Sequence, residues 1–145
     1  MLRDHGIGLR LQVLLYPATD LTMSSPSAEE HRNGPRLTTR DMVDFREHYV
    51  RPGADLRDPL LSPLFGRLED LPPALVQTAD LDPIRDDGIR YAAALRDAGV
   101  PARLTNYLGV PHGFVGVPGL TPVARQQRWE LVAELTAALA PARRD

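Results

Sequence analysis

The stretch ALVQTADLDPIRDDGIRYAAALRDAGVPARLTNYL, residues 74–108, decides the fold class of this 145-residue chain. It opens with a short apolar run at residues 74–79, which predicts a strand buried on both faces. Residues 82–99 predict a helix, because a proline in the first turn and a glycine just past the end are common helix boundaries. Residues 102–108 alternate between apolar and polar side chains and predict a further strand. This order of elements favours a right-handed unit of an α/β sheet.

Another strand is predicted upstream, at residues 11–16. Their sequence, LQVLLY, is an uninterrupted apolar run that Pro17 closes, again typical of a strand with both faces buried. Such a strand normally has neighbours on both sides, and this chain offers too few strands to provide them. The sequence therefore predicts an α/β fold with about three mostly parallel strands, flanking helices and an incomplete sheet.

Three segments outside the strands complete the pattern. Residues 20–36 are polar, rich in Ser and without periodicity, which predicts an exposed loop. Residues 39–49 predict a helix that Thr39 caps. The residues on the apolar face of that helix are Met42, Phe45 and Tyr49. Residues 122–139 predict a closing helix. Its core-facing residues are expected to be Val132, Leu135 and Leu139.

Composition argues against several classes of function. Apolar residues make up 43% of the chain and charged residues 25%, both typical of a folded globular protein. A net charge of −2 without a long basic run gives no reason to expect nucleic acid or an anionic membrane as a partner. The apolar run near the start is too short for a membrane span and lacks a signal-peptide pattern. A cytoplasmic protein without a membrane span is therefore expected.

The chain has no cysteine, which excludes disulfides, thiolate metal sites and a cysteine nucleophile. This absence fits a reducing compartment. Three of the four histidines lack an acidic or histidine partner at the spacing of metal ligands: His5, His31 and His48. Neither a metal nor a cofactor is therefore expected.

Asp82 and His112 each follow a predicted strand, and they lie 30 residues apart, about the length of one strand–helix–strand unit. Neighbouring parallel strands would place both side chains at the carboxyl edge of the sheet, where chemistry gathers in α/β folds. A carboxylate there can hold the proton on one imidazole nitrogen and leave the other nitrogen free to accept a proton from a hydroxyl nucleophile. Gly113 would let the backbone turn tightly behind the ring. The two residues are a candidate acid and base.

Structural interpretations of the same residues remain open. Asp82 followed by Pro83 is also a good helix N-cap, and a lone histidine in a loop is often only solvated. Asp86 and Asp87 would lie in the first helical turn, where carboxylates stabilise the helix dipole. On local sequence alone, Asp82 and His112 could therefore have structural or catalytic roles.

Three motifs together resemble a known family: LQVLLYPATD at residues 11–20, DPIRDDG at 82–88 and HGF at 112–114. In this order and spacing they are similar to the second half of the hormone-sensitive-lipase-like esterases, within the α/β-hydrolase superfamily. The resemblance extends from about residue 9 to about residue 140, nearly the whole chain.

The resemblance implies a carboxylic-ester hydrolase with a Ser–His–Asp triad, in which Asp82 is the acid and His112 the base. The three strands would be the sixth, seventh and eighth of the family's sheet, and residues 17–50 would border the acyl pocket. Dimers in the family form through the eighth strand and the last helix. A homodimer of this chain would therefore use residues 102–108 and 122–139.

The sequence departs from the family at the nucleophile. The family needs a serine on a G-x-S-x-G elbow, preceded by glycine-rich amides, and neither motif is present. The serines of this chain, none of which has such a context, are Ser24, Ser25, Ser27 and Ser62. Residues 1–145 are therefore expected to form a single partial domain that is inactive alone. An N-terminal half, from a longer gene product or a complementing chain, would supply the serine and the missing neighbour of residues 11–16.

A second hypothesis belongs to a different class. The chain could be a non-catalytic interaction or regulatory module derived from such an enzyme, which would pair with another chain through the edge of its first strand. Among enzymes, dienelactone-hydrolase-like and serine-peptidase folds also place a histidine after the last strand, although DPIRDDG argues against them. Activity after the addition of an N-terminal half would separate the enzyme from the module.

Overall fold

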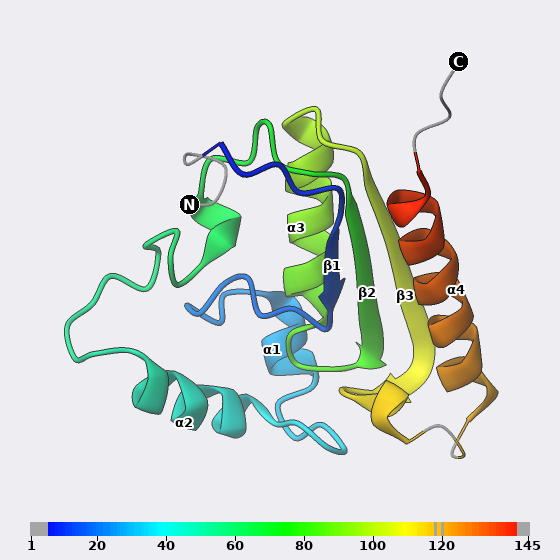
Figure 1. Ribbon diagram of the computed structural model, residues 1–145. Coiled ribbons are helices and arrows are strands. Elements are labelled where there is room, and N and C mark those ends of the chain that lie inside the picture. The colour runs from blue at the N-terminus through cyan, green and yellow to red at the C-terminus, as the bar shows by residue number, and fades with distance from the viewer. Residues whose placement is uncertain (1–5, 118, 120, 142–145) are drawn as a thin grey trace.

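Three parallel strands form the sheet of this computed structural model, which describes residues 6–117, 119 and 121–141. Their order is β1 (Gln12–Leu15), β2 (Ala74–Leu81) and β3 (Ala102–Pro111), as Figure 1 shows. The predicted α/β class and the parallel strands are therefore confirmed. Within the described residues the outer edge of β1 has no partner strand, so the sheet is open on that side.

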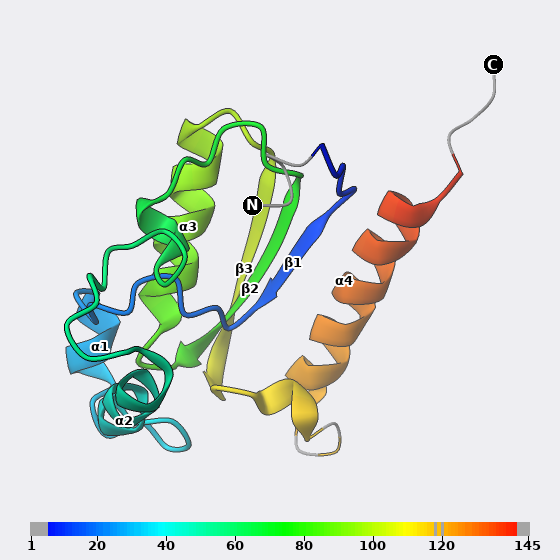
Figure 2. The same ribbon diagram turned by 60° about the vertical axis from the view of Figure 1, so that its left-hand side comes forward.

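Helices cover both faces of this sheet. α3 (Arg85–Asp97) lies on one face and α4 (Pro122–Leu139) on the other, which is clearest in Figure 2. Gly88 of α3 allows the helix to approach β2 closely, because a Cβ at this position would lie 2.5 Å from Thr78 Cγ2. The core on this face consists of Leu68, Ala74, Val76, Tyr91, Ala92, Leu95 and Val100.

The predicted helix at residues 82–99 starts later than expected. Its first helical residue is Arg85 and its N-cap is Ile84, so the interpretation of Asp82 as the N-cap is wrong. Asp82 instead begins a turn, in which its backbone carbonyl accepts a hydrogen bond from Arg85 N at 3.0 Å. The helix ends as predicted before Gly99, which has a left-handed backbone conformation (φ 77°).

Burial differs between the strands because β2 has a neighbour on each side and β1 has only one. The first six residues of β2 are buried. The residues of β1 are at most half-buried, and Leu15 is 36% exposed. β1 is therefore less buried than its apolar run indicates, because the sheet of the described residues lacks the second neighbour that the sequence predicted to be missing.

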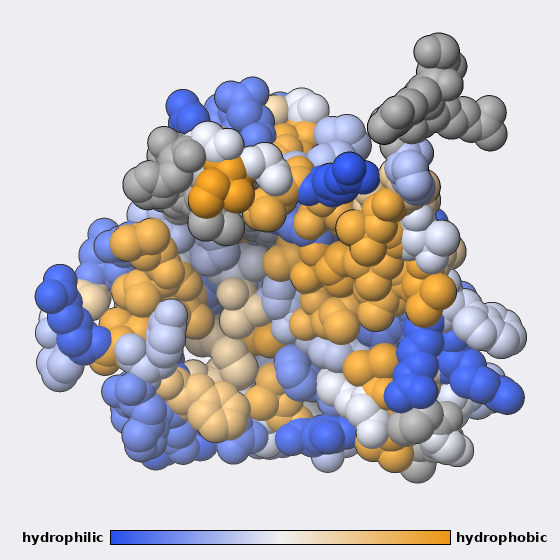
Figure 3. Space-filling model, viewed as in Figure 1, coloured by the Kyte–Doolittle hydropathy of each residue, from blue (hydrophilic) through white to orange (hydrophobic). Residues whose placement is uncertain are grey.

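α4 is buried mainly near its start, at Ala124 and Gln127, and most residues of its later turns are exposed. The prediction that its later apolar residues face the core is wrong, since Val132 and Leu139 are 60% and 67% exposed. Figure 3 shows apolar side chains gathered over β1 and α4. The term β1–α4 apolar surface is used below for Leu15, Val132, Leu135 and Leu139.

The excursion between β1 and β2 contains α1 (Pro26–Glu30), α2 (Thr39–Tyr49) and the 3-10 helix η2 (Pro63–Phe65). The predicted helix at residues 39–49 is confirmed, but its cap lies one residue earlier, at Thr38. The Thr38 hydroxyl accepts a hydrogen bond from Asp41 N, and the Asp41 carboxylate accepts one from Thr38 N. The described part of the chain contains no helix with the length and apolar character of a membrane span.

Candidate active site

The carboxyl edge of the sheet brings Asp82 and His112 together. Asp82 follows the last residue of β2, and His112 follows the last residue of β3. Along most of the ladder, partner residues of the two strands are 28 positions apart, but at its end Leu81 pairs with Pro111, 30 positions apart. Two additional residues of β3 therefore form a bulge that places His112 level with Asp82.

Gly109 lies within this bulge and has a left-handed backbone conformation (φ 70°), which glycine adopts without steric cost. Its N–H donates a hydrogen bond to Asp80 Oδ2 at 3.1 Å, which ties the bulge to β2. The sequence-based interpretation ended the strand at residue 108 and missed the bulge. A glycine beside an alternating strand pattern is the signal that could have indicated it.

The side chains of Asp82 and His112 form a short hydrogen bond. His112 Nδ1 lies 2.7 Å from Asp82 Oδ2. The Asp82 side chain is buried, whereas that of His112 is 30% exposed. The second carboxylate oxygen of Asp82 accepts a hydrogen bond from Ile84 N at 3.0 Å, so both oxygens have fixed partners. Because a carboxylate accepts hydrogen bonds, the pair favours a proton on Nδ1 and leaves Nε2 as the basic nitrogen.

The backbone behind the imidazole turns as expected. Gly113 has a left-handed conformation (φ 68°), and the 3-10 helix η3 (Phe114–Gly116) follows it. Arg36 Nη1 donates a hydrogen bond to the carbonyl of Gly113 at 3.3 Å, so the segment before α2 lies against this turn. The ring of Tyr16, at the end of β1, contacts the imidazole with a centroid distance of 5.1 Å. Sequence reasoning missed Tyr16, because nothing in its apolar run marks it as different.

The first turn of α3 holds the segment that follows β1. Asp87 is buried, and its carboxylate accepts hydrogen bonds from the backbone N–H groups of Thr19 and Asp20 and from the Ser25 hydroxyl. Burial raises the pKa of Asp87 above its ordinary value, although these hydrogen bonds oppose the shift. The prediction that residues 20–36 form an exposed loop is therefore wrong in part, because the polar groups of this segment find partners on α3.

Asp20 is a buried carboxylate in the same network. Burial opposes its ionisation, but hydrogen bonds from Ser24, Thr22 and Arg90 outweigh that effect and hold the pKa of Asp20 below its ordinary value. Arg90 Nη1 lies 3.0 Å from the carboxylate, so a cation of α3 compensates the buried charge. This network fixes the start of the excursion beside the turn at residues 82–85. Because this turn carries the candidate acid Asp82, it is called the acid-bearing turn below.

Replacing Asp20 with Asn should reduce the loss of stability in acid. Because the folded-state pKa lies below the unfolded value of about 3.9, the ionised carboxylate contributes stability that is complete above that pH. This contribution is lost as the pH falls through the folded-state pKa. Urea unfolding from about pH 6 to about pH 2 should therefore show a smaller decrease in unfolding free energy for the variant. Parallel decreases in the two proteins would contradict the assignment.

The serine hydroxyls are all engaged away from the imidazole. Ser24 and Ser25 donate to the carboxylates of Asp20 and Asp87, at 2.6 and 2.8 Å. Ser27 and Ser62 donate to backbone carbonyls, at 2.9 and 2.6 Å. All four serines of the sequence lie in the described part of the chain, and none forms a hydrogen bond with His112.

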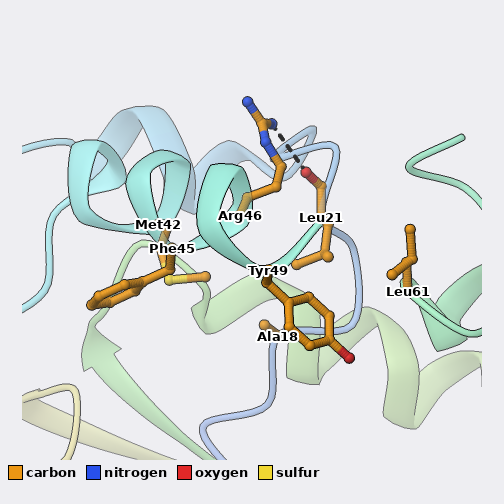
Figure 4. A pocket seen from close by; sticks show the side chains of 7 residues that line it. All are labelled: Ala18, Leu21, Met42, Phe45, Arg46, Tyr49 and Leu61. Atoms are coloured by element: carbon orange, nitrogen blue, oxygen red, sulfur yellow. Dashed lines mark hydrogen bonds between the residues drawn. The ribbon is translucent and has the colours of Figure 1, made fainter. Parts of the chain in front are cut away.

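A pocket of about 290 Å³ opens beside the acid-bearing turn, between α2 and the segment that follows β1 (Figure 4). Arg46 donates a hydrogen bond to the carbonyl of Leu21 at 3.2 Å and so joins its two sides. Met42, which lines the pocket, packs in one cluster with Ile84, two residues after Asp82. The pocket is lined by Ala18, Leu21, Met42, Phe45, Arg46, Tyr49 and Leu61. It lies in the segment that was predicted to border an acyl pocket, and that role stays a prediction.

No group of three or more His, Asp or Glu side chains among the described residues could hold a metal ion. The predicted cytoplasmic location and homodimer stay predictions.

Comparison with known proteins identifies related chains. A family model described as an alpha/beta hydrolase fold matches residues 1–116. Esterase LipI of Mycobacterium tuberculosis is 40% identical over 124 residues, which cover 83% of this chain and 38% of the relative. Carboxylesterase NlhH of the same species is 39% identical over 140 residues, which cover 92% of this chain and 43% of the relative. The chain thus spans well under half the length of these two relatives.

Solved structures agree with the sequence comparison. A hyperthermophilic esterase from the archaeon Pyrobaculum calidifontis superposes with a TM-score of 0.89 at 40% identity, covering 97% of this chain and 48% of that protein. The thermostable carboxylesterase EstE1, cloned from a metagenomic library, gives a TM-score of 0.91 at 32% identity. The arrangement of three parallel strands and two flanking helices is therefore one that esterases of known structure share.

Proposed function

This chain belongs to the α/β hydrolase fold family, and on that basis we propose that it carries the acid and base of a carboxylic-ester hydrolase. His112 is the base and Asp82 is the acid. The single observation that carries the proposal is the 2.7 Å hydrogen bond between His112 Nδ1 and the buried Asp82 carboxylate at the carboxyl edge of the sheet. The relatives that match this chain are named as esterases, which supports an ester as the substrate.

The proposed reaction is acyl transfer through a serine. As the serine oxygen attacks the ester carbonyl, its proton moves to Nε2 of His112, and the Asp82 carboxylate stabilises the imidazolium that forms. His112 then gives this proton to the departing alkoxide, which leaves as an alcohol. Water releases the acyl group by the same steps, with its proton taken by Nε2 and returned to the serine. Throughout these steps the Asp82 carboxylate accepts a hydrogen bond from Nδ1–H and does not take up the proton itself.

In this proposal the nucleophile comes from outside the 145 residues. The engagement of all four serine hydroxyls with other partners supports this, as does the absence of a G-x-S-x-G elbow from the sequence. The open edge of β1 and the β1–α4 apolar surface are where the serine-bearing part would pack. Residues 1–145 would then be one part of a single hydrolase domain, and the chain alone would not turn over esters.

The pocket beside α2 is assigned to the substrate. Its lining is mostly apolar, which suits the hydrocarbon part of an ester better than a charged group. Its position next to the Ile84 cluster places it near the acid-bearing turn. We assign it to the acyl or alcohol chain of the substrate.

A chimera tests this proposal. The N-terminal half of the Pyrobaculum calidifontis esterase, joined ahead of this chain, should hydrolyse p-nitrophenyl butyrate, whereas the chain alone should not exceed the buffer rate. Replacement of the elbow serine in the added half by Ala is the control and should abolish the reaction. Hydrolysis by the chain alone would place the nucleophile within these residues and contradict the proposal.

The same experiment addresses a non-catalytic role. The unpaired edge of β1 and the exposed apolar residues of α4 also favour an interaction module. A chimera that folds cooperatively, as circular dichroism on heating would show, but that hydrolyses no ester would support the module over the enzyme.

A further inference from the structure

Tyr16 has a backbone conformation that is uncommon for a buried aromatic residue. Its φ is 49°, in the left-handed region that favours glycine, while only 8% of its surface is exposed. Its backbone N–H still donates to the carbonyl of Gln77 at 2.8 Å, so the β1 ladder continues up to this residue. The chain then turns sharply into Pro17. Strain of this kind persists where surrounding contacts enforce it, and such positions concentrate at functional sites.

The contacts of the Tyr16 ring show what this conformation achieves. The ring lies against the imidazole of His112, with centroids 5.1 Å apart and planes tilted by 54°. It also packs edge-on against Phe114, at 5.5 Å. His112 and Phe114 flank the left-handed Gly113, so one aromatic ring supports both sides of the turn that presents the base.

The Tyr16 hydroxyl is fixed as firmly as its backbone. It donates to Gln127 Oε1 on α4 at 2.7 Å and accepts a weak hydrogen bond from Val115 N at 3.4 Å. Burial raises the pKa of Tyr16 above its ordinary value, so the hydroxyl keeps its proton. The ring is therefore held at one end by the β1 ladder and at the other by α4.

We propose that Tyr16 is a positioning residue, whose ring holds the imidazole of His112 in the orientation that pairs Nδ1 with Asp82. The hydrogen bond to Asp82 restrains one nitrogen only, and a side chain that is 30% exposed could rotate about that bond toward solvent. The contact with the Tyr16 ring gives the imidazole a second restraint, which opposes this rotation. The role in catalysis rests on the proposed function, whereas the restraint on the imidazole can be measured without it.

Nuclear magnetic resonance of the 145-residue chain tests the proposal. The Nδ1 proton of His112 should give a low-field signal that Asp82→Asn removes. Tyr16→Leu removes the ring but keeps a Cβ, so the left-handed backbone at this position is strained to a similar degree in the variant. It should speed exchange of this proton with water about tenfold, or broaden the signal beyond detection, as about 1.4 kcal/mol of lost restraint would do. Tyr16→Phe, which keeps the ring, should retain the signal.

Tyr91→Leu is the matched control, because Tyr91 is equally buried but belongs to the core on the α3 face. It should leave the exchange rate of the His112 proton unchanged. A wild-type signal that Tyr16→Leu does not affect would overturn the positioning role while the acid–base pair stands. Absence of the signal from the wild type would overturn the pair as well. If Tyr16→Leu does not fold, a missing nuclear Overhauser effect between the ring of residue 16 and the imidazole in Tyr16→Phe would overturn the proposal.

Discussion

Replacing His112 with Ala should lower the kcat of the active chimera about 10⁶-fold, because loss of the histidine from a serine triad removes nearly all of the triad's contribution. Without Nε2, no group is placed to take the serine proton as the ester carbonyl is attacked. The KM should change much less, since the imidazole acts mainly in the transition state and contributes little to ground-state binding. Initial rates with p-nitrophenyl butyrate over a range of concentrations would measure both constants.

His48→Ala is the matched control. His48 lies on α2, is exposed, and makes its hydrogen bond to the backbone carbonyl of Asp44 at 2.6 Å. Its replacement should leave kcat unchanged. A decrease of less than about tenfold on replacing His112, a loss of only about 1.4 kcal/mol, would mean that another group accepts the proton and that His112 is not the base.

The central strand of the sheet could be predicted from the sequence, because its apolar pattern agrees with its burial in the structure. β2 has a strand on each side, so its apolar run corresponds to real burial on both faces. For β1 and for the later turns of α4, the apolar pattern does not correspond to burial within the described residues. An apolar run shows that a segment avoids water, but it does not show which part of the molecule covers it. Within the described residues, nothing covers the outer edge of β1 or the apolar residues at the end of α4.

The prediction that the polar segment at residues 20–36 is exposed was wrong in part, because some of its polar groups are buried. Residues 20–36 were predicted to be an exposed loop because they are polar and lack periodicity, yet Asp20, Ser25 and Ser27 are buried. Asp20 accepts hydrogen bonds from its neighbours Thr22 and Ser24, but it also pairs with Arg90 of α3. The partners of Ser25 and Ser27 are a carboxylate of α3 and a backbone carbonyl just before it, more than 50 positions away. Buried polar groups depend on such long-range partners, and a local pattern contains no information about them.

The proximity of Asp82 and His112 was predictable from their spacing, but the means by which it arises was not. A regular ladder would pair Asp82 with a residue two positions before His112, and the bulge in β3 supplies the difference. The orientation of the imidazole also depends on Tyr16, whose left-handed backbone cannot be read from an apolar run. Sequence reasoning thus identified the candidate acid and base, whereas the contacts that surround them are visible only in the structure.

The two carboxylate oxygens of Asp82 bear on the alternatives that the sequence left open. It does not cap α3, yet one carboxylate oxygen accepts a hydrogen bond from Ile84 N in the turn before the helix. The other oxygen faces His112 Nδ1. A structural contact and a candidate catalytic contact are therefore made by the two oxygens of one side chain, and the first fixes the direction of the second.

Asp82→Asn should lower the kcat of the chimera about 10⁴-fold with little change in structure. The asparagine carbonyl can still accept the hydrogen bond from Ile84 N, which turns the amide NH2 toward His112 Nδ1. An NH2 group donates, so Nδ1 has to accept and the imidazole proton moves to Nε2. Nε2 then cannot take the proton of the serine.

Asp80→Asn is the control for this substitution. Asp80 lies on β2, two residues before Asp82, and its carboxylate accepts a hydrogen bond from Gly109 N in the bulge of β3. Its replacement should affect kcat less than about tenfold, because an amide oxygen can still accept that bond. Long-range ¹H–¹⁵N spectra of the imidazole would report the tautomer in each variant. Retention of the Nδ1 proton in an inactive Asp82→Asn protein would contradict the tautomer argument, because the loss of activity would then arise elsewhere.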